Sequence, residues 1–108
     1  MTKEILSARW GVWRIASTEP LRMRVWEGDS VVYNPKSGQT HQVDVVSAFV
    51  LKRLMTCSAS LDELCTATEA FLELDDQALI ERTVGHTLES LGTIGLVEVQ
   101  VNYDGDAP

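Results

Sequence analysis

Residues 21–44 decide the fold of this chain: LRMRVWEGDSVVYNPKSGQTHQVD. The first six residues alternate in character, and a side-chain period of two is typical of a half-buried strand. The alternation puts an apolar set on one face and a basic or aromatic set on the other, namely Leu21, Met23 and Val25 against Arg22, Arg24 and Trp26. Two further strands are predicted over residues 31–33, which are β-branched and aromatic, and over residues 39–43.

Turn residues separate the three strands. Residues 27–29, Glu-Gly-Asp, supply the first turn. Residues 34–38, Asn-Pro-Lys-Ser-Gly, supply the second, because Pro35 fixes φ and Gly38 can take a positive φ. The stretch therefore predicts an antiparallel meander over residues 21–43. Helices follow it, so its outer strand keeps an unpaired edge, and such an edge can accept an extended peptide.

Helical periodicity begins directly after the meander. Asp44 is placed to act as an N-cap, and apolar residues recur at helical spacing from 45 to about 55. Ser60 and Glu63 form a capping-box pattern before a second apolar stripe. We therefore expect two helices with a short connection between them.

A third helix is predicted over residues 77–91. Asp75 and Asp76 suit the positive end of its dipole, and Gly92 is a plausible stop. The fold class is therefore α+β, with a three-stranded antiparallel sheet followed by three helices.

The remaining segments complete one predicted domain, residues 1–108. The N-terminal arm, residues 1–19, contains two tryptophans and is either an additional strand or a segment laid over the core. The spacing of its apolar residues does not distinguish between these two structures. Residues 44–97 hold the helices and a short strand or wing-like end. Residues 102–108 are expected to be a flexible tail.

Charge is unevenly spread along the sequence. The formal net charge is −7, yet residues 1–26 hold five bases against two acids, a net charge of +3. The rest therefore carries −10, which opposes DNA binding by the helices. No segment approaches the ~20 apolar residues of a membrane span, and no secretory signal is recognisable, so a cytoplasmic protein is expected.

No catalytic or metal-binding constellation is evident. Cys57 and Cys65 lack the spacing of a zinc site and are expected to be reduced and structural. Neither His41 nor His86 sits beside a nucleophile in a recognisable motif. We therefore expect no enzymatic activity, no metal and no cofactor.

Three surfaces are candidates for binding. Arg22 and Arg24 face outward on the first strand, either as a solvated face or as a contact for an acidic partner. Trp10 and Trp13 either cover the core or contact a partner protein. A second face of the third helix has too few charges for a typical solvated face and is a candidate groove wall: Leu79, Thr83, His86 and Thr87.

The order of these patterns resembles the PqqD family. The last helix ends in Leu-Gly-x-x-Gly-Leu, residues 91–96, and VVYN followed by SGxTH over residues 31–41 is especially similar to PqqD-like proteins of HPr kinase-related systems. The resemblance implies a winged helix-turn-helix-like fold that acts as a leader-peptide recognition element for ribosomally made, modified peptides. Such proteins bind the precursor's leader as an added strand and present it to a modifying enzyme, often a radical SAM protein.

Carried onto this sequence, the resemblance implies two sides of a peptide cleft. One is the strand edge, Gln39, Thr40, His41, Gln42 and Val43, and the other is the helix face of Leu79, Thr83, His86 and Thr87. The long arm with Trp10 and Trp13 departs from PqqD itself. The alternatives are an adaptor that docks on an enzyme without a peptide of its own, a winged-helix DNA-binding regulator, and a homodimer formed through exposed edges.

Overall fold

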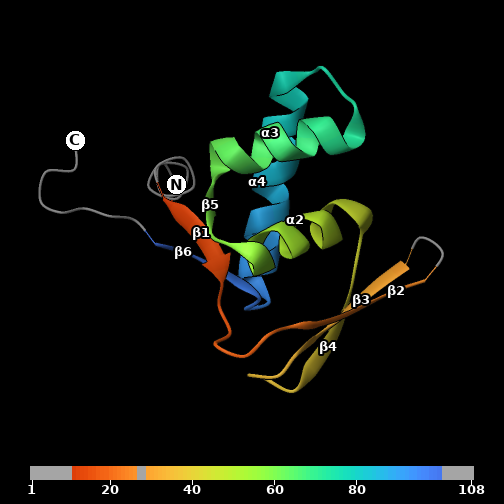
Figure 1. The fold of residues 1–108 in the computed structure, drawn as a ribbon, viewed down its shortest axis with the longest axis vertical. Coiled ribbons are helices and arrows are strands. Elements are labelled where there is room, and N and C mark those ends of the chain that lie inside the picture. The colour runs from red at the N-terminus through yellow and green to blue at the C-terminus, as the bar shows by residue number, and fades with distance from the viewer. Residues whose placement is uncertain (1–10, 27–28, 101–108) are drawn as a thin grey trace, which may run out of the picture.

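The computed structural model of the chain describes residues 11–26 and 29–100 (Figure 1). Two three-stranded sheets and three helices make up this part of the chain, in the order β1, β2, β3, β4, α2, β5, α3, α4, β6. The predicted α+β class is thereby confirmed. Trp10 and the predicted tail, residues 102–108, lie outside the described residues.

The meander forms as the sequence indicates. Strands β2 (Arg22–Trp26), β3 (Asp29–Asn34) and β4 (Gln39–Val43) pair antiparallel in chain order. Gly38 takes φ +76°, and its amide donates to the carbonyl of Asn34 across the second turn. In Figure 1 the meander lies at the lower right, away from most of the helical body.

The predicted faces of β2 are correct at all but one of the positions whose burial is described. Leu21 is buried and Met23 is half-buried, while Arg22 and Arg24 are exposed. Val25, expected on the core face, is 55% exposed instead. Its cross-strand partner is Ser30, close to the end of the sheet. Alternation along a strand sets the face to which a side chain points. The side chain is buried only where a helix packs on that face.

The N-terminal segment contributes a strand, which was one of the two predicted alternatives. Strand β1 (Val12–Ile15) is the centre of a second sheet, between β5 (Ala59–Ser60) and β6 (Val97–Gln100), and both pairings are antiparallel. The second sheet therefore joins segments from both ends and the middle of the described chain.

Side-chain caps start the three helices. Asp44 accepts a hydrogen bond from the amide of Ser47 at the start of α2 (Val45–Thr56), at 2.8 Å. Ser60 and Glu63 complete the predicted capping box of α3 (Leu61–Leu72). Asp76 caps α4 (Gln77–Thr93) by accepting from the amide of Leu79. Each cap satisfies an amide that has no partner within its helix.

Helix α4 ends later than predicted. It continues through Gly92 to Thr93, and Gly95 takes the positive φ of +80°. The amide of Leu96 donates to the carbonyl of Leu91, and that of Gly95 donates to that of Gly92. These two bonds form a Schellman motif, in which the left-handed residue follows the C-cap. Gly95 is therefore the stop that the sequence analysis placed at Gly92.

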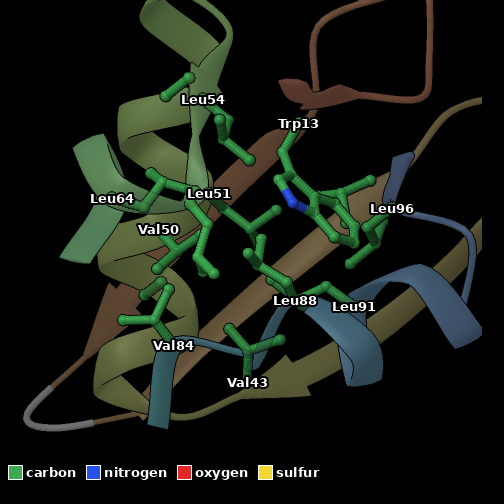
Figure 2. Packing of buried hydrophobic residues seen from close by; sticks show 14 of the residues in the cluster. Trp13, Val43, Val50, Leu51, Leu54, Leu64, Val84, Leu88, Leu91 and Leu96 are labelled. Atoms are coloured by element: carbon green, nitrogen blue, oxygen red, sulfur yellow. The ribbon is translucent and has the colours of Figure 1, made fainter. Parts of the chain in front are cut away.

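One core joins both sheets to the helices (Figure 2). Trp13 from β1, Val32 from β3 and Val43 from β4 are buried in the same cluster as leucines and valines of the three helices. Cys65 is buried as expected, whereas Cys57 is exposed at the end of α2, where its sulfur accepts from Arg53 at 3.1 Å. No helix in residues 11–26 and 29–100 has the length and apolar character needed to cross a membrane.

Candidate peptide-binding edge and cleft

Strand β4 is an edge strand. It pairs with β3 on one side, and no strand of the described part of the chain pairs with its other side. Gln39, Thr40 and Gln42 are exposed, and His41 is half-buried. In an antiparallel edge strand, alternate residues direct their amide and carbonyl groups outward, and these groups can pair with a guest strand.

Val43 closes one end of this edge. Its side chain is buried in the core, and in Figure 2 it lies beside Val84 and Leu88 of α4. Among the predicted peptide-binding residues, Val43 can therefore offer a guest only its main chain. Its burial places the end of β4 in the same core cluster as Val84 and Leu88 of the helix that was predicted as the opposite wall.

The predicted wall on α4 is only partly a surface. Leu79 is 41% exposed, His86 is exposed and Thr83 is half-buried. Thr87 is buried, which corrects its assignment as a wall residue. At 100° per residue it falls within the buried stripe of the helix, whereas the other three lie together on one flank.

This flank of α4 faces away from β6. On the opposite flank, a Cβ built on Gly92 would lie 3.8 Å from the carbonyl oxygen of Val97, so that side of the helix adjoins β6. Leu79, Thr83 and His86 are about 120–180° away from Gly92 around the axis, as helical geometry requires. Because Leu79 and His86 are also exposed, this flank presents side chains that a guest can contact.

The two predicted sides of the cleft are brought together at one end only. In Figure 1 the first turn of α4, which carries Leu79, lies at the top, whereas β4 lies near the bottom. Leu79 precedes Val84 and Leu88 by five and nine residues, roughly 7 to 14 Å along the axis. A guest on β4 would need about two to four extra extended residues beyond Val43 to reach it.

His41 carries an unexpected feature. Its side chain lies on the core-facing side of the meander opposite Val32, and its Nε2 atom is buried without a hydrogen-bond partner among the described residues. Buried polar atoms are almost always paired, so such an atom marks a place where a partner can be gained. The sequence analysis placed His41 on the peptide-binding edge and gave no signal that its Nε2 atom is buried and unpaired.

The predicted partner contacts divide into two groups. Trp13 is 6% exposed and belongs to the core, so its assignment as a partner contact is wrong. Arg22 and Arg24 are exposed as predicted, and they line a hollow of about 910 Å³ on the outer face of the meander with Val31 and Tyr33. Cross-strand pairing places these residues together, which the separate strand predictions did not reveal.

Comparison with known proteins adds evidence on the fold. No family model and no curated protein matches the chain. Among solved structures it is similar to lasso peptide synthetase B1 complexed with the leader peptide, with a TM-score of 0.59 and 16% sequence identity. The match covers 80% of this chain and 96% of that chain. The described fold is therefore like that of a protein seen with a leader peptide bound.

Proposed function

We propose that this protein binds the leader of a ribosomally made precursor peptide by strand addition to β4 and presents it to a modifying enzyme. The carrying observation is the unpaired side of β4, whose last residue, Val43, is buried in the core cluster that also contains residues of α4. The fold likeness to lasso peptide synthetase B1 with its leader supports the proposal. The PqqD-like pattern of residues 31–41 supports placing the protein in an HPr kinase-related system.

The edge and the helix flank have different tasks in this proposal. Main-chain hydrogen bonds to residues 39–43 give affinity that depends little on the guest sequence. The exposed side chains of Leu79 and His86, with the half-buried Thr83, select the part of the guest that runs beyond Val43. Ordering a flexible peptide opposes binding, so we expect a dissociation constant in the micromolar range, about −8 kcal/mol.

Catalysis is left to the partner in this proposal. The protein holds the leader in an extended conformation, and the modifying enzyme, such as a radical SAM or kinase-related protein, acts on the rest of the precursor. Docking and release of the leader are then the only steps that this chain performs.

The first experiment tests main-chain pairing at β4. A synthetic leader from a short precursor encoded beside the gene is titrated by calorimetry into the parent protein, Thr40→Pro and Thr40→Ala. Proline removes the amide donor and restricts φ, whereas alanine keeps both, so we expect at least tenfold weaker binding for Thr40→Pro alone. Arg24→Ala, on the outer face, should bind as the parent does. Equal affinities for all four proteins would contradict the proposal.

The length of the guest tests the cleft. Leaders truncated to five residues should retain only the pairing with β4, and restoring about four residues past Val43 should recover affinity through the α4 flank. Amide chemical shifts should then change on residues 39–43 first and on the first turns of α4 only with the longer peptides. Shifts confined to the β1–β5–β6 sheet would place the site elsewhere.

A further inference from the structure

The hollow on the outer face of the meander has features of a second binding site. By register, Arg22 pairs with Tyr33 and Arg24 pairs with Val31, so the four side chains occupy one face. That face is opposite to the one that carries Val32 and His41. The hollow of about 910 Å³ therefore lies on the other side of the sheet from the core and from the unpaired His41 atom.

The two arginines form no ion pair with an acid of the described residues, although Glu19 lines the same hollow. Arg14 shows how this protein satisfies an arginine on a strand: its cross-strand partner is Glu98, and the two side chains form an ion pair at 2.7 Å. Arg22 and Arg24 instead face an aromatic and an aliphatic partner, and neither forms an ion pair within residues 11–26 and 29–100. Two adjacent positive charges are thus left for an external anion.

The spacing of the arginines selects an extended segment. Residues two apart on a strand are about 7 Å apart, which equals the separation of side chains at i and i+2 of an extended guest. Tyr33 is 37% exposed and Val31 is half-buried between the strands, so apolar surface lies beside the charges. Guanidinium groups bind carboxylates with paired hydrogen bonds, and aromatic surface strengthens such contacts.

We propose that this face docks an acidic, extended segment of the modifying enzyme, with carboxylates at alternate positions on Arg22 and Arg24 and an apolar side chain against Tyr33. The identity of the partner rests on the proposed function, but the chemistry of the face does not. Because β2 and β4 are the two outer strands of the sheet, they are separated by about 10 Å. Leader and enzyme can therefore be held at the same time.

The test uses a defined probe, the blocked peptide Glu-Ser-Glu-Ser-Leu-Ser, whose two carboxylates and one apolar side chain point to the same face when it is extended, and a matched peptide with Gln at each Glu. We expect the acidic probe to shift the amide signals of residues 22–24 and 31–33 and to leave those of residues 39–43 in place. The Gln peptide should bind at least tenfold more weakly. Shifts on residues 39–43 instead, or no binding of the acidic probe, would overturn the proposal.

Paired variants separate a specific site from general attraction. Arg22→Gln with Arg24→Gln should weaken the probe at least tenfold, whereas Lys52→Gln with Arg82→Gln, which also removes two exposed positive charges, should not. Glu19 also lines the hollow, so Glu19→Gln should strengthen binding about two- to threefold. Equal weakening by both double variants would overturn the proposal.

Leader binding provides the independent readout. The Arg22→Gln, Arg24→Gln double variant should bind the synthetic leader as the parent does, because the two sites are on different strands. Loss of leader binding in this variant would show one shared site and overturn the inference. A different outcome is that no leader binds the parent protein while the acidic probe still binds at residues 22–24 and 31–33. This outcome would count against the proposed function and would support the outer-face site.

Discussion

At His41 and Thr68 the chain buries polar atoms without a described partner, and the two sites differ in where they lie. His41 Nε2 faces the core side of β4, whereas Thr68 Oγ1 is buried in α3. An unpaired buried polar group costs about 1–3 kcal/mol, and an apolar replacement of similar shape removes that cost. His41 lies on the proposed guest-binding strand, so a guest can use its Nε2 atom only if the imidazole turns out of the core.

We therefore predict opposite effects on stability and binding at His41. His41→Leu should leave the free energy of unfolding unchanged or raise it by about 1 kcal/mol, and should weaken leader binding. Thr68→Val, the control, should stabilise by a similar amount and leave binding unchanged. Urea unfolding and calorimetry measure the two quantities. Unaltered leader affinity in His41→Leu would mean that the guest does not use Nε2.

The glycines of α4 and its C-terminus provide a second prediction. Gly95 has φ +80°, where a side chain is strained, whereas Gly85 lies within the helix and a built Cβ has nothing within 4 Å. Gly95→Ala should lower the free energy of unfolding by about 1 kcal/mol. Gly85→Ala should raise it by up to about 1 kcal/mol, because alanine is the better helix former. Thermal unfolding of both variants measures the difference, and equal effects would contradict the Schellman stop.

The elements themselves were largely predictable, because their signals are local. Alternation between turn residues predicted β4 at its observed bounds, Asp44 and Ser60 cap their helices as expected, and Asp76, predicted only to suit the dipole of the third helix, is its N-cap. The end of α4 was missed because Gly92 and Gly95 have the same sequence signal. Only the path of the chain into β6 determines which of the two adopts the left-handed conformation.

The α4 flank gives a prediction with a matched control. Leu79 on α4 and Leu74 in the preceding loop are each 41% exposed. Truncating either to alanine should cost little stability, about 0.5 kcal/mol or less, because both side chains are largely in solvent. Only Leu79→Ala should weaken binding of a leader that extends beyond Val43, as measured by calorimetry. Equal losses for both variants would show that the flank is not the selective surface.

At the scale of the molecule, the second sheet escaped sequence analysis for a physical reason. Val12 and Gln100 are cross-strand partners although 88 positions separate them, and no local pattern encodes such a pairing. For the same reason, only part of the candidate site could be predicted from the sequence. The β4 edge follows from the meander, and the hollow beside Arg22 follows from the pairing of β2 with β3, whereas the burial of Thr87 depends on how α4 packs against distant elements.

The shared core predicts that both sheets unfold together. Trp13 of β1 and Val32 of β3 pack in one cluster with the helices. Trp13→Ala should therefore cost about 3–5 kcal/mol and Val32→Ala about 2 kcal/mol, with one cooperative transition in each case. Amide signals from β1–β6 and from β3–β4, followed through a urea titration, should disappear at the same midpoint. Earlier loss of the β3–β4 signals in Val32→Ala would make the meander a separate unit. Leader binding would then have to order β4 as well as pair with it, and its affinity would fall by the cost of that folding.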